Sequence, residues 1–209
     1  MKSMKLSETI IEPLLPSEIS NAADLLSRSL STDPMSIGLF REPSKKTSKT
    51  LAHVFKLMLE ALPCEILCIK DAGRVVAVMR MVKPGKCQPS TKQLLQAMPR
   101  LLGASGTKFN RVLKYLTFLS EYDPKERHWH LGPFAVDPEV QGMGFGSHLL
   151  NYVCDYVDRR GDAAYLETNK ARNVKFYERY DFSTINEALL YDVPNWFMWR
   201  ATRKFSVKT

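Results

Sequence analysis

Three glycines at alternating positions, Gly142, Gly144 and Gly146, are the residues whose type and spacing point most directly to chemistry. An apolar strand pattern precedes them and an amphipathic helix pattern follows them. The first N–H groups of a helix have no partner within the helix, and they lie at the positive end of its dipole. Glycine lets such a backbone approach an anion without obstruction by a Cβ atom. The spacing therefore predicts a cradle for a pyrophosphate group.

Two other phosphate-binding loops do not fit this glycine run. A Walker A loop ends in Gly-Lys and then Ser or Thr, whereas Gly146 is followed by Ser147 and His148. A dinucleotide-binding loop has the spacing G-x-G-x-x-G after an early strand, whereas this run reads G-x-G-x-G late in the chain. A turn that only packs a helix closely is the alternative reading, because short glycine motifs recur by chance.

Histidine and cysteine side chains are the candidate metal ligands in this sequence. His128 and His130 share one face of a predicted strand, but no third ligand follows at a recognisable spacing, so we expect no metal. The cysteines show neither metal-binding nor redox spacing, and we expect four free thiols: Cys64, Cys68, Cys87 and Cys154.

The composition is that of a folded protein with a basic surplus. Of 209 residues, 44% are hydrophobic and 25% are charged, which excludes wholesale disorder. The formal net charge of +8 suits an anionic partner, but the basic residues are scattered and do not select one. No segment is apolar enough to span a bilayer, and residues 1–7 lack the apolar core of a secretory signal. We therefore expect a cytoplasmic protein.

Strand and helix patterns alternate along the chain and must position the glycine run. The first half is predicted to hold a strand at 7–13, a helix opened by Pro16 with Ser17 as N-cap, a helix at 46–61 and a hairpin at 64–82. The second half is predicted to begin with two helices at about 90–123, which Gly103–Gly106 separates. Strands are predicted at 128–137, 163–167, 182–191 and 195–202. One helix is predicted between the glycine run and Gly161, and another at 170–180.

This order predicts an α/β fold in which a mixed sheet carries a helical insertion between two central strands, all within a single domain. The pair Gly132-Pro133 interrupts the strand at 128–137. Proline removes a donor from the ladder, so the pair predicts a bulge or the point where strand pairing ends.

Two motifs together resemble the signatures of the GNAT superfamily of N-acetyltransferases. Gln141, Gly144 and Gly146 match its Q/R-x-x-G-x-G/A motif. The segment 166–182 resembles its second pattern, N-x-x-x-Y-x-x-x-G-F, in the expected order and at a typical separation. One departure is Asp181, which replaces the usual glycine before the phenylalanine, and we expect it to adopt the left-handed conformation that aspartate tolerates.

A closer resemblance covers about 128–200, where segments 128–131, 166–168 and 176–179 are similar to puromycin N-acetyltransferase and its relatives. The family resemblance implies a mainly antiparallel sheet flanked by helices, and acetyl-CoA as cosubstrate. It also implies a set of cofactor-binding residues, which hold the pyrophosphate and pantetheine: Phe134, Ala135, Val136, Gln141, Gly142, Met143, Gly144, Phe145, Gly146, Ser147, Asn173 and Tyr177. For Asn173, a helix cap is the alternative reading.

Three residues are candidates for catalysis. Tyr177 matches the family's tyrosine, and a phenol with a pKa near ~10 is suited to protonating a departing thiolate. A core tyrosine with a satisfied hydroxyl is the alternative. His130 or Glu167 is expected to take the proton of the attacking amine, directly or through water. His130 can instead be an ordinary strand histidine, and Glu167 can instead bind the acceptor ammonium.

The expected function is direct transfer of an acetyl group from acetyl-CoA to a primary amine of a small molecule, in a ternary complex. An acyl-enzyme route is not expected, since Cys154 faces away from the start of its helix. The alternatives are acetylation of protein N-termini or lysines, and a non-catalytic module that binds acyl-CoA or nucleic acid. The insertion at 92–122 favours an enclosed small-molecule pocket. We expect neither nucleic acid nor membrane as partner, and a monomer or homodimer.

Overall fold

The computed structural model describes residues 9–41, 45–61 and 63–203, and within these ranges seven strands form one sheet in the order β1-β2-β3-β4-β5-β7-β6. The strands are β1 (Ile11–Pro13), β2 (Cys64–Asp71), β3 (Arg74–Val82), β4 (His128–Val136), β5 (Ala163–Thr168), β6 (Ser183–Leu190) and β7 (Val193–Arg200). Neighbouring strands are antiparallel except β4 and β5, which are parallel. The predicted mixed, mainly antiparallel sheet is confirmed.

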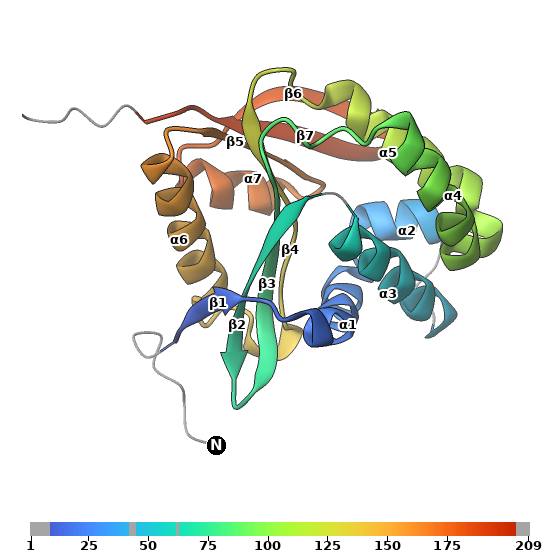
Figure 1. Cartoon of the computed structure of the whole chain (residues 1–209), viewed down its shortest axis with the longest axis horizontal. Coiled ribbons are helices and arrows are strands. Elements are labelled where there is room, and N and C mark those ends of the chain that lie inside the picture. The colour runs from blue at the N-terminus through green and yellow to red at the C-terminus, as the bar shows by residue number, and fades with distance from the viewer. Residues whose placement is uncertain (1–8, 42–44, 62, 204–209) are drawn as a thin grey trace, which may run out of the picture.

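Helices cover both faces of the sheet (Figure 1). They are α1 (Ile19–Leu30), α2 (Pro34–Phe40), α3 (Lys45–Glu60), α4 (Thr91–Ser105), α5 (Phe109–Tyr122), α6 (Phe145–Arg159) and α7 (Ala171–Glu178), with short 3-10 turns η2 (Pro16–Glu18), η3 (Gly106–Lys108) and η4 (Pro138–Val140). α6 and α7 pack on one face, and α1, α2, α3 and α5 pack on the other. The strand period of two explains both contacts, since Leu67 and Ile69 of β2 join the α6 side while Cys68 joins the α1 side.

The parallel strands β4 and β5 separate partway along their length. Residues 128–130 pair with residues 163–165, and the pairing stops there although both strands continue. Gly132-Pro133 follows directly, and Pro133 has no N–H to donate. β4 continues against β3 as far as Val136. The predicted end of pairing is therefore confirmed on the β5 side, and it leaves an opening between the two central strands.

Two N-terminal predictions were wrong. The first strand covers only Ile11–Pro13, and residues 7–8 of the predicted strand lie outside the described residues. Ser17 is not an N-cap, because Pro16–Glu18 form a 3-10 turn in which the Leu15 N–H donates to Glu18 Oε2 at 3.0 Å. The side chain of Glu18, and not that of Ser17, therefore secures the chain before α1.

Two further differences concern helices. α2 was not predicted, although Asp33 caps it by accepting a hydrogen bond from the Met35 N–H at 3.1 Å and Pro34 occupies its first position. Gly103 lies inside α4 and does not separate the two insertion helices. The other predicted segments agree with the structure to within two residues at each end.

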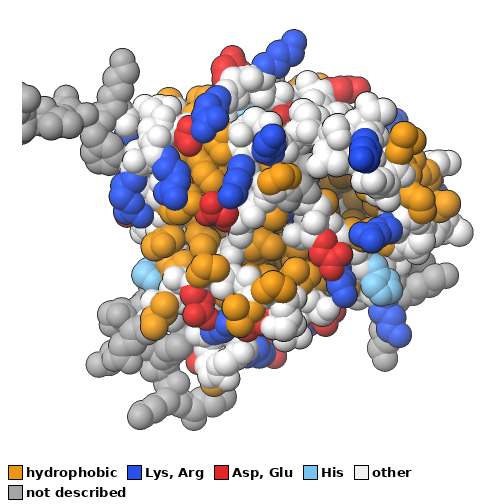
Figure 2. All heavy atoms as spheres, viewed as in Figure 1, with side chains coloured by type: hydrophobic (Ala, Val, Ile, Leu, Met, Phe, Trp, Pro, Cys, Tyr) orange, Lys and Arg blue, Asp and Glu red, His pale blue; other side chains and the backbone are white. Residues whose placement is uncertain are grey.

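Three further features are the state of the cysteines, the distribution of charge on the surface and the length of the apolar helices. All four cysteines are free thiols, as predicted. On the face shown in Figure 2, Lys and Arg side chains are interspersed with acidic and apolar ones and form no continuous band. No helix among the described residues is long and apolar enough to cross a lipid bilayer.

Candidate active site

The glycine run forms the turn that enters α6. Gly142 and Gly144 have φ values of 83° and 92°, a region that favours glycine, and Gly144 is the N-cap of α6. A Cβ atom added at Gly146 would lie 3.4 Å from Val136 Cγ2 and 3.5 Å from the Phe134 ring, which are ordinary contacts. This position therefore accepts Gly or Ala, as the family motif does. Gly144, as the N-cap, has no side chain to cap the start of α6, so the first N–H groups of this helix can bind an anion.

The turn between β4 and α6 is held in place at the Val136 carbonyl oxygen. This oxygen accepts hydrogen bonds from Gln141 Nε2 and from Ser29 Oγ, each at 2.9 Å. The buried Asp137 carboxylate accepts from the Glu139 N–H at 3.0 Å and pairs with Arg28 at 2.7 Å. Gln141, a predicted cofactor-binding residue, thus has its amide nitrogen bonded to the loop itself.

His130 and Glu167 lie on the two strands that part. His130 Nε2 is 3.0 Å from Glu167 Oε2, and His130 Nδ1 is 3.1 Å from Asp123 Oδ1. Ionised carboxylates only accept hydrogen bonds, so both ring nitrogens donate. Burial opposes the charge of this imidazole, but the negative charge of Glu167 and the bond to Asp123 outweigh burial and hold the pKa of His130 well above its usual range.

The second carboxylate oxygen of Glu167 differs from the first in its hydrogen bonding. Glu167 Oε1 is buried, and it has no hydrogen-bond partner among the described residues. A buried carboxylate oxygen without a partner costs free energy, because it has lost its hydration. A ligand with an N–H donor can remove this cost. Among the predicted site residues, Glu167 therefore offers a hydrogen-bond acceptor to a substrate.

Tyr177 lies on α7 and is 8% exposed. Burial, and then the negative charges of Asp33 and Glu167, raise the pKa of Tyr177 above that of an ordinary phenol. No hydrogen bond of its hydroxyl is found within the part of the chain that the structure describes. The phenol thus keeps its proton at neutral pH and has it free to donate.

Sequence patterns missed two residues near this site. Tyr115 lies on α5, where its helical spacing resembles an apolar face, and burial followed by the charges of Glu167 and Asp33 raises its pKa. Asp33 caps α2 and pairs with Lys170 at 3.1 Å, which joins the α1–α2 connection to the β5–α7 connection. The pair Asp33-Pro34 is a typical helix-cap signal in the sequence, whereas no sequence pattern marks Tyr115 as a site residue.

Asn173 is the third residue of α7, whose N-cap is Lys170, so the helix-cap reading of Asn173 was wrong. Its Nδ2 atom donates to Thr168 Oγ1 at 3.1 Å, which fastens the start of α7 to the end of β5. The other predicted cofactor-binding residues lie along the free end of β4 and in the turn into α6: Phe134, Ala135, Val136, Met143, Phe145 and Ser147.

A metal was not expected because no third ligand follows the two histidines at a recognisable spacing. The fold, however, brings two further candidate ligands to them. The ligating atoms of Cys87 and Asp123 lie within 4.8 Å of each other and of one nitrogen on each of His128 and His130. Both extra residues flank the helical insertion: Cys87 precedes α4 and is far from β4 in the sequence, whereas Asp123 follows α5 and lies shortly before β4.

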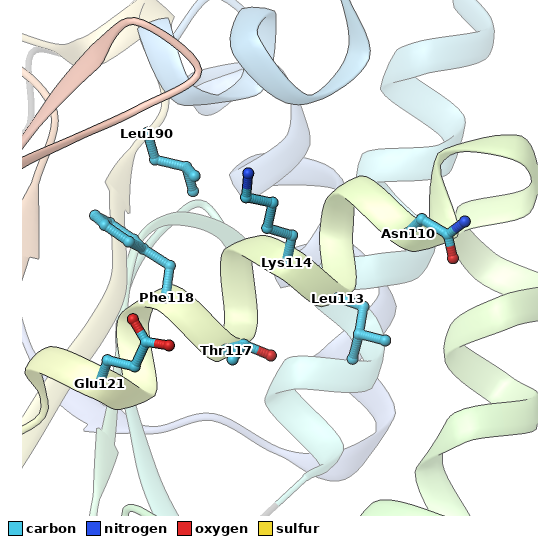
Figure 3. A pocket seen from close by; sticks show the side chains of 7 residues that line it. All are labelled: Asn110, Leu113, Lys114, Thr117, Phe118, Glu121 and Leu190. Atoms are coloured by element: carbon cyan, nitrogen blue, oxygen red, sulfur yellow. The ribbon is translucent and has the colours of Figure 1, made fainter.

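A separate hollow of about 350 Å³ lies along α5 (Figure 3). Its walls come from α5 and the end of β6: Asn110, Leu113, Lys114, Thr117, Phe118, Glu121 and Leu190. None of the predicted site residues lines it. The hollow is therefore separate from the β4–β5 opening, beside which the predicted site residues lie.

Comparison with known proteins agrees with this geometry. The model of the Acetyltransferase (GNAT) family matches residues 39–182. A structure of histone acetyltransferase HPA2 and related acetyltransferase from Corynebacterium glutamicum is 22% identical, with 95% of this chain and 99% of that chain covered and a TM-score of 0.72.

Two other solved structures share the fold at lower identity. A polyamine N-acetyltransferase from Drosophila melanogaster is 14% identical, with 92% of this chain and 98% of that chain covered and a TM-score of 0.61. The ribosomal-protein-S18-alanine N-acetyltransferase from Escherichia coli is 16% identical, with coverage of 96% and 99% and a TM-score of 0.55. Since the family match spans more than half of the sequence, this chain belongs to the GNAT family of acetyl-CoA-dependent N-acetyltransferases.

Proposed function

We propose that this chain transfers an acetyl group from acetyl-CoA to a primary amine of a small molecule, directly and in a ternary complex. The observation that carries the proposal is the unpartnered, buried Glu167 Oε1 on one of the two strands that part in front of the uncapped start of α6. The helix start suits the pyrophosphate of the donor, and the carboxylate oxygen suits the amine of the acceptor.

The donor would lie along the end of β4. Residues 131–136 have a strand neighbour only on the β3 side, so backbone groups facing β5 are left for the amide groups of pantetheine. Val136 leads through η4 to the α6 cradle, which suits one extended ligand that runs from the strand to the helix start. A backbone N–H on this free stretch would polarise the thioester carbonyl.

The chemistry then needs a base and an acid. The ammonium loses one proton to the base, and its nitrogen then bonds to the carbonyl carbon. As the C–S bond breaks, the nitrogen loses a second proton and the thiolate of CoA gains one. Glu167 is the better supported base, because Oε1 can accept a proton whereas both nitrogens of His130 already donate. Tyr177 is the acid, since its hydroxyl proton has no competing acceptor.

The acceptor class follows from the charges around Glu167. Asp33 and Glu167 are the carboxylates that act on both Tyr115 and Tyr177, and each has a cationic partner, Lys170 and His130 respectively. Glu167 Oε1 has no partner among the described residues, so it is the oxygen that can bind an ammonium. Tyr115 lies on α5, and the insertion thus contributes to the acceptor side of the site, which favours a small molecule over a polypeptide. The Drosophila structure is named as a polyamine N-acetyltransferase that forms N-acetylagmatine, which supports small cationic amines as the first to be tested.

Acetyl-CoA binding is predicted to depend on Gly144. Saturating acetyl-CoA should raise the thermal midpoint of the wild-type protein, with about 2.7 kcal/mol of stabilisation at 100 times Kd. A Gly144→Val variant should lose most of this shift, because Val disfavours a φ of 92° and the N–H groups of the cradle must turn away. Differential scanning fluorimetry measures both.

The matched control is Gly161→Val, which imposes similar strain at a φ of 65° near the opposite end of the same helix. It should lower the midpoint of the free protein but retain the acetyl-CoA shift. Equal shifts of the thermal midpoint in Gly144→Val and in the wild type would contradict binding of acetyl-CoA at the start of α6. A shift with an oligonucleotide instead of acetyl-CoA would favour the nucleic-acid module.

A further inference from the structure

Four side chains with metal-ligating atoms converge beside the active site, on the side of His130 away from Glu167. His128 and His130 come from β4, Cys87 from the loop between β3 and α4, and Asp123 from the residue directly after α5. The four atoms are Cys87 Sγ, Asp123 Oδ1, His128 Nε2 and His130 Nδ1. All lie within 4.8 Å of one another.

Their separations match the edges of a tetrahedral site. Zinc bonds of about 2.0–2.3 Å place tetrahedral ligands about 3.3–3.7 Å apart. Cys87 Sγ is 3.5 Å from His128 Nε2, and Asp123 Oδ1 is 3.6 Å from His128 Nε2 and 3.1 Å from His130 Nδ1. An ion at the centre therefore needs only small movements of these side chains.

The outer atoms of the four side chains are also held. The His128 Nδ1–H donates to the Glu126 carbonyl at 2.7 Å, and this leaves Nε2 to face the cluster. The His130 Nε2–H donates to Glu167 Oε2 at 3.0 Å, and Nδ1 faces the cluster, where a metal ion would replace the proton that it donates to Asp123 in the metal-free state. Gln88 Nε2 holds the other oxygen of Asp123 at 3.0 Å. Metal-binding histidines almost always have such a carbonyl or carboxylate on the second nitrogen.

Burial of this cluster also favours a bound metal ion. The His128 and Asp123 side chains are 3% and 6% exposed, and the rings of Tyr165 and Trp199 pack against His128 at centroid distances of 5.4 and 5.6 Å. In such a setting two imidazoles and a thiol face the single carboxylate oxygen Asp123 Oδ1 as a hydrogen-bond acceptor. A soft, tetrahedral dication satisfies all four together, and this donor set suits zinc.

We propose that Cys87, Asp123, His128 and His130 bind one Zn²⁺. Four protein ligands close the coordination sphere, so the ion is structural and takes no part in the transfer. The position of the ion has two consequences for the structure. It fastens both ends of the α4–α5 insertion to β4, and through His130 it holds Glu167 Oε2 in place while Oε1 stays free.

The test uses the full chain made metal-free with a chelator and then titrated with Co²⁺. We expect one Co²⁺ per chain, with the strong visible absorption of tetrahedral cobalt and a near-ultraviolet sulfur-to-cobalt charge-transfer band. Cys87→Ser should remove that band and weaken Zn²⁺ binding by more than the 10–100-fold that loss of an outer partner causes. The matched control Cys64→Ser, another half-buried thiol on a nearby strand, should keep both.

A second readout needs no variant. Chelation should lower the thermal midpoint of the wild type and expose residues 91–122 to limited proteolysis, and added Zn²⁺ should reverse both changes. Substoichiometric binding, or a charge-transfer band that survives in Cys87→Ser, would overturn the site. The stabilisation by acetyl-CoA is measured separately on the same samples, so failure of the metal site and failure of the cofactor cradle can be told apart.

Discussion

Replacement of Tyr177 by Phe should lower kcat by about 10²–10⁴-fold, the usual contribution of a positioned acid. The departing thiolate of CoA then lacks a proton donor, because the lost hydroxyl has a raised pKa and forms no hydrogen bond with another described group. The Kd for acetyl-CoA should stay within about 2-fold, since the ring and its contacts with Phe176 and Phe182 remain. Steady-state kinetics and a binding titration measure the two effects.

The matched control is Tyr180→Phe, one helical turn farther along the same chain segment, where the ring packs against Phe176. It should change kcat little. Wild-type kcat in Tyr177→Phe would leave this tyrosine with a packing role only, and an equal loss in both variants would point to packing of α7 instead of acid catalysis.

Replacement of Glu167 by Gln should lower kcat/KM for the amine by about 10²–10⁴-fold. The amide keeps the shape of the side chain and can still accept the His130 N–H, but it cannot take a proton or carry the charge that attracts an ammonium. Stabilisation by acetyl-CoA should persist, since Glu167 lies on β5 and not in the turn into α6.

Glu178→Gln on the exposed side of α7 serves as the control for loss of one negative charge. It should leave kcat/KM nearly unchanged. Full activity in Glu167→Gln would contradict the assignment and return His130 to consideration as the base. A rise in KM at constant kcat would instead assign Glu167 to binding of the ammonium.

Local patterns explain why much of the fold could be predicted. The hairpin at 64–82 and the helix after the glycine run are each specified by side-chain periodicity and by nearby glycines, and they lie within two residues of their predicted limits. The left-handed conformation of Asp181, with φ of 63°, was predicted because Asp181 stands where the family pattern has a glycine. The Ser17 prediction failed because Ser17 lies inside the 3-10 turn Pro16–Glu18, and the N-cap position of α1 is Glu18.

The surroundings of the site depended on long-range contacts that no local pattern reveals. Cys87 reaches the histidines of β4 only because α4 and α5 fold back on themselves between it and β4, whereas Asp123 lies shortly before β4 but follows no recognisable ligand spacing. Tyr115 has the spacing of a core residue, yet it lies near Glu167. Even Gln141, identified through its motif, has a bond to Val136 that the motif alone does not imply.

The most direct test of the account is release of free CoA thiol by the purified chain, with acetyl-CoA and each of a panel of small amines, polyamines and aminonucleosides, beside a peptide with a free N-terminus. We predict saturable thiol release with at least one small amine, and an acetylated product of matching mass. Binding of acetyl-CoA without release for any amine would contradict transfer and identify a non-catalytic acyl-CoA module. Release with the peptide alone would contradict the proposed acceptor class.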